Sequence, residues 1–175
     1  IDYRDAGFQS VIVNLSTQTA NGVDREHTQK THQDGATSED QFFTQPTSVF
    51  LTDGDDHFYG SDGEAAPWYF VNPGKGSDNL TDFGHVHYDV YISDPTVTDM
   101  AAYQVSGNSW VIGQSATDNI LFEISFDENG SLVIDGSGGI DPSHGRDVLS
   151  SDAAFRILSF EIDASNGFGK EIGFD

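Results

Sequence analysis

Two short segments share one pattern, Gly54-Asp-Asp-His-Phe58 and Gly76-Ser-Asp-Asn-Leu80. Each contains a glycine, an aspartate two positions later and an apolar residue two positions after that. The two aspartates, Asp56 and Asp78, lie 22 positions apart, which equals two nonapeptide repeats plus four extra residues. Because two nonapeptides complete one turn of a parallel β-coil, the spacing predicts that the aspartates stack on one edge and that the apolar residues point inward.

A third copy of the pattern, Gly145-Arg-Asp-Val-Leu149, lies far downstream. The pattern is short, and an acidic chain with 19 glycines will produce it by chance. Since this copy has no neighbour at repeat spacing, we interpret it as an ordinary turn before a strand or a helix.

The charge of the chain excludes several classes of protein. Its 175 residues carry 29 acidic and 7 basic side chains, a net charge of −22, which is wrong for a protein that binds nucleic acid or anionic lipid. There is no apolar run long enough to span a membrane, and no cysteine for a disulfide or a thiolate metal site.

Of the acids, 22 are Asp and 7 are Glu. Aspartate favours turns and hard-cation sites, so the excess predicts many turns.

Hydrophobic patterning predicts an all-β protein with at most two short helices. Alternating or apolar runs that are typical of strands occupy residues 11–15, 68–71, 86–92, 109–112, 120–126 and 131–134. Residues 151–158 could form a capped helix and residues 98–102 a single helical turn. The polar stretch 16–45 is interpreted as a long surface loop or an irregular insertion.

The segments around the two motifs point to a known family. Gly74-Lys-Gly-Ser-Asp-Asn-Leu-Thr-Asp-Phe83, followed by Asp89-Val-Tyr-Ile92, is similar to the way calcium-binding rolls end. Upstream, the segments 3–6 and 11–22 resemble the strand pair that often precedes such rolls. The chain therefore resembles the RTX, or haemolysin-type, calcium-binding repeat family. The resemblance implies one domain over residues 1–175, with a short parallel β-roll over about 48–95 that is continuous with β-sandwich-like strands. It also implies a module of a larger bacterial protein, exported by a type I route to the cell surface or the medium.

In such a roll a calcium ion lies between stacked turns, and its ligands are carboxylates and peptide carbonyls, the oxygen donors that this ion prefers. Asp82 and Asp89 are secondary candidates. The primary candidates are Asp53, Gly54, Asp55, Asp56, Gly74, Gly76 and Asp78.

Two other groups of residues suggest binding roles. Trp68 and Tyr69 could stack on a sugar, although core packing is the better explanation of a Trp-Tyr-Phe run. His85 and His87 lie on one face of an extended segment together with Asp89, which suits a metal site or simply an exposed strand. No motif of a hydrolase or a phosphate-binding loop is present. Two alternatives to a calcium-binding module stay open: part of a secreted polysaccharide-acting enzyme, and an adhesin domain that binds an extracellular glycan or a surface.

Overall fold

The computed structural model describes residues 1–4, 7–16, 22–25, 27–41, 46, 48–60, 68–81, 85–92, 101–107, 109–114, 117, 119–150, 158–164 and 169–174. These residues form strands and turns, with no helix among them. The strands are β1 (Phe8–Asn14), β2 (His27–His32), β3 (Thr37–Gln41), β4 (Ser48–Phe50), β5 (His57–Tyr59), β6 (Trp68–Asn72), β7 (Asn79–Thr81), β8 (His85–Ile92), β9 (Ala101–Ser106), β10 (Ser109–Gly113), β11 (Ile120–Phe126), β12 (Leu132–Asp135), β13 (Arg146–Ser150), β14 (Leu158–Ala164) and β15 (Gly169–Phe174).

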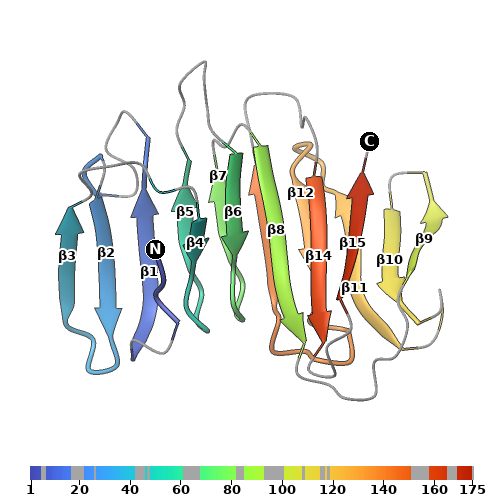
Figure 1. Ribbon diagram of the computed structural model, residues 1–175, viewed down its shortest axis with the longest axis horizontal. Coiled ribbons are helices and arrows are strands. Elements are labelled where there is room, and N and C mark those ends of the chain that lie inside the picture. The colour runs from blue at the N-terminus through green and yellow to red at the C-terminus, as the bar shows by residue number, and fades with distance from the viewer. Residues whose placement is uncertain are drawn as a thin grey trace.

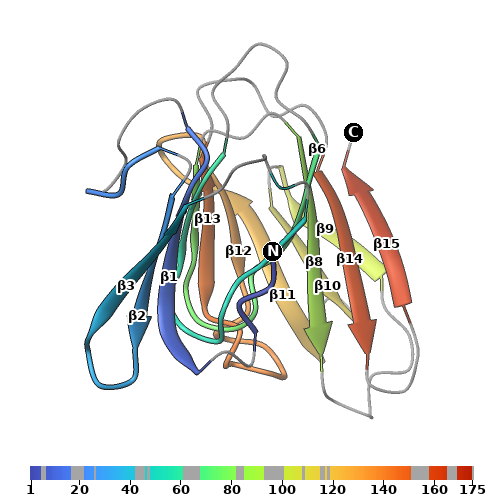
Figure 2. The same cartoon turned by 60° about the vertical axis from the view of Figure 1, so that its left-hand side comes forward.

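The described strands build two sheets that face each other (Figures 1 and 2). The larger has ten strands in the order β3-β2-β1-β5-β7-β13-β12-β11-β10-β9, and the smaller has five in the order β15-β14-β8-β6-β4. From β4 to β8 the chain alternates between the sheets, and each strand runs parallel to its neighbour. Each strand of this segment is therefore one half-turn of a parallel coil.

Antiparallel strands extend the coil. The hairpin β2–β3 continues the larger sheet beyond β1. The meander β9–β12 is inserted between β8 and β13 and extends the same sheet at its other end. After the meander, β13 pairs in parallel with β7, and β14 pairs in parallel with β8. The insertion therefore interrupts the coil in sequence but not in space.

Apolar side chains in register form the core of the coil. Val13, Phe58, Leu80 and Leu149 are neighbours across four adjacent parallel strands, and each is 0% exposed. Burial of such a side chain contributes about 1.5–3 kcal/mol to folding. The expected inward orientation of the apolar position is therefore confirmed for Phe58 and Leu80, and Leu149 of the third copy is buried in the same way.

The all-β class expected from the sequence is confirmed. The expected helical turn at 98–102 is wrong where it can be checked, because Ala101 and Ala102 lie in β9, where β10 pairs with them. Leu158, expected near the end of a short helix, begins β14, and residues 151–157 lie outside the described part of the chain. The stretch 16–45 is not simply a loop.

The strands β2 and β3 form a hairpin within that stretch, around a turn in which Gly35 has a φ of 81°. The hairpin has few apolar residues because only one of its side chains, Thr28, is fully buried, and that hydroxyl accepts a hydrogen bond from Tyr3. Because these strands bury almost no side chains, their sequence lacks the apolar alternation that indicates a strand. The Asp34-Gly35 pair is the sequence feature that indicates a turn here.

Candidate functional site

The three Gly-x-Asp turns lie side by side at one edge of the coil. They precede β5, β7 and β13, which are adjacent parallel strands. The copy at 145–149, interpreted above as an ordinary turn, therefore forms the third row of the stack. The sequence feature that indicates this third row is the match of the copy to the other two at the glycine, aspartate and apolar positions. The long separation of this copy from the others in sequence hides the match.

Three aspartate side chains link these rows into a ladder. The carboxylate of Asp56 accepts a hydrogen bond from the backbone N–H of Val11 at 2.6 Å. Asp78 accepts one from the N–H of Asp56 at 2.7 Å, and Asp147 accepts one from the N–H of Asp78 at 2.8 Å. Asp56, Asp78 and Asp147 are 0%, 1% and 5% exposed. Each carboxylate thus satisfies a backbone donor of the preceding coil inside the protein.

Burial makes this ladder electrostatically unfavourable when it is ionised. Desolvation raises the pKa of Asp56 to about 6, although hydrogen bonds from Val11 and Thr52 oppose the shift. Desolvation also raises the pKa of Asp78, and the nearby carboxylates of Asp147 and Asp56 raise it further. One oxygen of Asp78, Oδ2, is buried and has no hydrogen-bond partner among the described residues. At neutral pH the ladder therefore needs either protons or a compensating positive charge.

The raised pKa values predict an unusual pH dependence for the protein in the presence of a chelator. An acid whose pKa is higher in the folded than in the unfolded protein stabilises the fold at low pH. This stabilisation is fully present below the unfolded-state pKa of 3.8 and is lost as the pH rises through the folded-state pKa, which is about 6 for Asp56. We therefore expect the free energy of unfolding to fall from pH 4.5 upward, by on the order of 1.4 kcal/mol per pH unit for each group that is still protonated in the folded protein. The contribution of Asp56 levels off above about pH 6, whereas that of Asp78, whose pKa is raised further, continues to fall up to pH 7.5. Urea titrations at several pH values measure this change.

Asp56→Asn is the non-titrating variant for this experiment: its amide oxygen can still accept from the N–H of Val11, whereas its NH₂ group replaces the oxygen that accepts from the N–H of Thr52. The slope with pH, and not the stability at a single pH, is therefore the quantity to compare. The stability of this variant should depend less steeply on pH than that of the unchanged protein. A chelated protein that becomes more stable from pH 4.5 to 7.5 would contradict the assignment of raised pKa values to the ladder.

Close backbone contacts bring the rows together. A Cβ added to Gly76 would lie 2.5 Å from the carbonyl oxygen of Gly54, and one added to Gly145 would lie 1.9 Å from the carbonyl oxygen of Gly76. Gly76 also has a φ of 93°, which favours glycine. The glycines therefore allow carbonyl oxygens of successive turns to pack beside the aspartate ladder.

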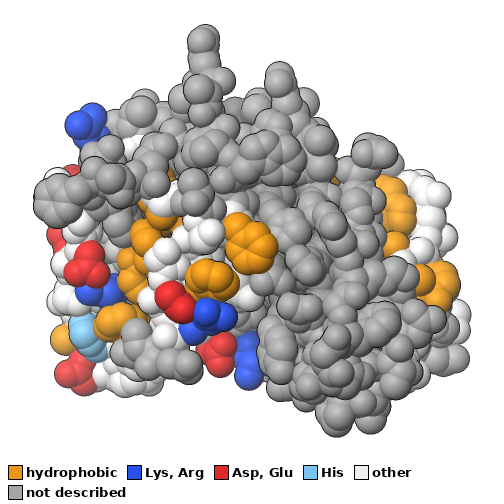
Figure 3. All heavy atoms as spheres, viewed as in Figure 1, with side chains coloured by type: hydrophobic (Ala, Val, Ile, Leu, Met, Phe, Trp, Pro, Cys, Tyr) orange, Lys and Arg blue, Asp and Glu red, His pale blue; other side chains and the backbone are white. Residues whose placement is uncertain are grey.

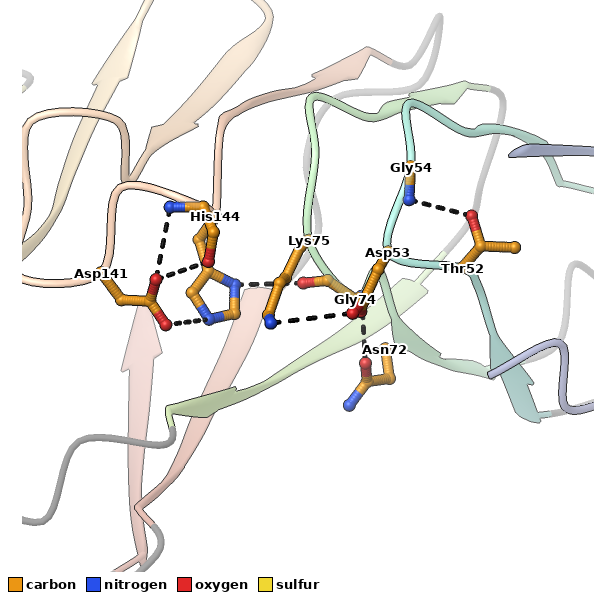
Figure 4. A network of polar contacts seen from close by, with 9 residues as sticks. Thr52, Asp53, Gly54, Asn72, Gly74, Lys75, Asp141 and His144 are labelled. Carbon is orange, nitrogen blue, oxygen red and sulfur yellow. Dashed lines mark hydrogen bonds and ion pairs between the residues drawn. The ribbon is translucent and has the colours of Figure 1, made fainter. Parts of the chain in front are cut away.

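More exposed polar side chains lie along the same edge. Asp55 is exposed and accepts a hydrogen bond from the N–H of Ser77 at 2.9 Å. The carboxylate of Asp53 lies 3.7 Å from the ammonium group of Lys75, and both are well exposed, so this ion pair contributes little to stability. Figure 4 shows the Asp53–Lys75 pair beside the turns.

Two residues that sequence reasoning missed attach the inserted meander to the coil. His144 is buried, and its Nδ1 donates a hydrogen bond to the carbonyl oxygen of Gly74 at 3.0 Å (Figure 4). Its Nε2 lies 3.6 Å from the carboxylate of Asp141. Burial acts to raise the pKa of Asp141, but the Ser143 hydrogen bond and His144 outweigh it and lower that pKa. No sequence signal marked this pair, because its partners lie on a distant turn.

The structure gathers the primary candidates and leaves the others apart. Asp53, Gly54, Asp55, Asp56, Gly74, Gly76 and Asp78 all lie in the two adjacent turns at the ladder edge. Trp68 and His85 are paired at the start of β6 and β8. The turn that contains Gly74 and Gly76 follows the end of β6, so this pair lies at the opposite edge of the coil.

Tyr69, His87 and Asp89 also lie within β6 and β8, and the structure does not describe their side chains. Asp82 lies outside the described residues. Within the described ranges, no three carboxylate, imidazole or thiol groups are grouped as a ready-made metal site. The ladder carboxylates lie one above another rather than around a common centre.

Comparisons with known proteins identify no relative. No family model matches the chain, and neither a curated protein nor a solved structure matches it. The described part of the chain contains no helix of the length and apolar character needed to cross a membrane.

Proposed function

We propose that this chain is a calcium-binding module of a larger exported bacterial protein, and that calcium stabilises its stacked Gly-x-Asp turns. The observation that supports this most is the ladder of three buried aspartates, Asp56, Asp78 and Asp147. Buried carboxylates that lie close together are unfavourable unless they are neutralised. A divalent cation at this edge would supply the missing positive charge.

The donor chemistry of the edge fits calcium. Calcium takes six to eight oxygen ligands, from carboxylates, peptide carbonyls and water. Asp78 has a buried oxygen with no partner among the described residues, and Asp53 and Asp55 present exposed carboxylates in the adjacent turn. Carbonyl oxygens of Gly54 and Gly76 pack against the following row. Because the carboxylates do not surround one point, we expect carbonyls and water to complete the ligand set.

The same chemistry suits a protein that functions outside the cell. Calcium that binds the folded chain and not the unfolded chain stabilises it by RT ln(1 + [calcium]/Kd). With a net charge of −22, the chain repels itself until cations bind. Folding would then be favoured where calcium is abundant, as expected for an exported protein.

Thermal unfolding with calcium and with a chelator tests this proposal. At pH 7.5 we expect calcium at 100 times its Kd to add about 2.7 kcal/mol of stability, with a matching rise in the unfolding midpoint. Asp55→Asn keeps an oxygen that can accept from Ser77 but loses a charge, so it should reduce the gain from calcium. Glu39→Gln removes the same charge on β3, away from the turns, and should leave the gain intact.

An unchanged midpoint with and without calcium would rule out the calcium proposal. Equal stabilisation of the Asp55→Asn and Glu39→Gln variants would remove Asp55 from the ligand set.

A second candidate is a glycan-binding role, as in an adhesin or a secreted polysaccharide-acting enzyme. A shallow depression beside the ladder is lined by Arg4, Asp53, Asn72, Lys75, Asp141 and His144. Charged and amide side chains of this kind hydrogen-bond sugar hydroxyls. Titration with polysaccharides, with Lys75→Ala as the variant, separates this role from a purely structural calcium module.

A further inference from the structure

The larger sheet ends in β9, and the hydrogen-bonding edge of this strand faces outward. Among the described strands, β9 pairs with β10 alone. Figure 1 shows it at the right-hand limit of the sheet. A strand in this position presents unpaired N–H and C=O groups that can pair with another strand.

This edge lacks charged and proline residues, two of the usual protections against such pairing, although a β-bulge at Val105 interrupts the strand near its end. Proteins commonly place charged residues or proline on edge strands. At the opposite end of the sheet, β3 carries Glu39 and Asp40. In contrast, β9 has the sequence Ala-Ala-Tyr-Gln-Val-Ser, and no charged residue occurs anywhere from position 100 to 117. The other uncharged stretch of this length, residues 6–23, contains β1, which lies inside the sheet between β2 and β5 and not at an edge.

Exposed apolar side chains gather at the same end of the molecule. Val105 in β9 is 53% exposed and Phe126 in β11 is 40% exposed, and these are the large hydrophobic side chains that stand exposed among the described residues. A groove beside them is lined by Val105, Trp110 and Ile124, among others. Figure 3 shows hydrophobic and uncharged described atoms at this end, whereas charged side chains are visible at the other.

We propose that β9 pairs with β9 of a second copy of this chain, in antiparallel orientation, to form a two-fold symmetric dimer. The charge of the chain argues for this occupant and this location. Two copies that each carry −22 repel one another over most of their surface, and the uncharged edge is where they can approach. Antiparallel pairing of one strand with itself is an isologous contact, in which the same surface serves both copies.

The alternation of side chains restricts the register of this pair. Opposite residues in an antiparallel pair must point to the same face of the sheet, so the two-fold axis passes beside a residue and not between two residues. Alternation in β9 holds from Ala101 to Gln104, because the pairing with β10 shifts register at Val105, so we place the axis at Tyr103. In this register Gln104 lies opposite Ala102 of the second copy, and the apolar groove is adjacent to the contact.

Sedimentation velocity over a range of protein concentration tests the proposal. We expect a monomer–dimer equilibrium that shifts toward the dimer as salt is added, because salt screens the repulsion between the copies. Gln104→Glu places like charges at the contact without changing side-chain size and should raise the dimer dissociation constant by about tenfold or more. Gln41→Glu is the matched control on β3, which is exposed and at the other end of the sheet, and it should leave the constant nearly unchanged.

Cross-linking gives an independent result, because the chain has no cysteine of its own. Under oxidising conditions Tyr103→Cys, at the residue that lies opposite itself across the axis, should form a disulfide-linked dimer, whereas Gln41→Cys should not. The proposal is overturned if the protein stays monomeric at both low and high salt. It is also overturned if the Gln104→Glu and Gln41→Glu variants associate equally well. Circular dichroism of each variant establishes that the fold is retained.

Discussion

Replacing Asp78 with Asn is expected to stabilise the calcium-free protein and to remove most of the stabilisation that calcium confers. The amide retains an oxygen that can accept the hydrogen bond from the N–H of Asp56. It also removes a buried acid whose pKa is raised by burial and by the carboxylates of Asp147 and Asp56. The same change removes an oxygen ligand and the negative charge that attracts the cation.

The size of the first effect follows from proton linkage. A buried acid that keeps its proton costs about 1.4 kcal/mol for each pH unit above its ordinary pKa, because the unfolded chain ionises freely. At pH 7 we therefore expect a gain on the order of 2–4 kcal/mol for Asp78→Asn in chelator. Urea unfolding at pH 7, with chelator and with calcium, measures both effects.

Glu39→Gln provides the control for lost charge, since Glu39 is exposed on β3. It should change stability by less than about 0.5 kcal/mol in either condition. If Asp78→Asn destabilises the chelated protein, then the ladder carboxylates are stabilising by themselves. That result would remove the main physical reason for expecting a cation.

Replacing Gly145 with Ala is expected to destabilise the protein by about 3 kcal/mol or more, with or without calcium. The new Cβ would lie 1.9 Å from the carbonyl oxygen of Gly76 and 2.4 Å from the hydroxyl of Ser77. The carbonyl is backbone in a packed turn and cannot rotate away, so the third row must separate from the second. Overpacking of well-packed sites typically costs about 1–3 kcal/mol, and a contact this short should exceed that range.

Gly107→Ala is the matched control, because no described atom lies within 4 Å of the position its Cβ would occupy. Its stability should stay within about 0.5 kcal/mol of the unchanged protein. Differential scanning calorimetry can compare the two, with an expected fall in Tm of about 6–12 °C for Gly145→Ala. Similar Tm values for both variants would mean that the third row does not pack against the second.

Much of the coil could be predicted from local sequence. Glycine and aspartate at fixed offsets before Phe58 and Leu80, together with the 22-residue spacing, placed two turns on one edge. Six expected strands also agree closely with β1, β6, β8, β10, β11 and β12. These predictions succeeded because side-chain alternation and turn chemistry depend on neighbours in sequence. The β2–β3 hairpin was missed because its strands are mostly polar and solvent-facing, so they give no hydrophobic alternation.

The sequence by itself determined the all-β class, the acidic surface and the two turns that carry Asp56 and Asp78. Only the tertiary structure decided that Asp147 completes the ladder, since it lies 69 positions beyond Asp78 and reaches it after the inserted meander. Burial and the raised pKa values likewise depend on the tertiary structure. The physical reason is that sequence spacing fixes which edge a side chain occupies within a repeat, whereas desolvation and contact between like charges arise when distant segments pack together.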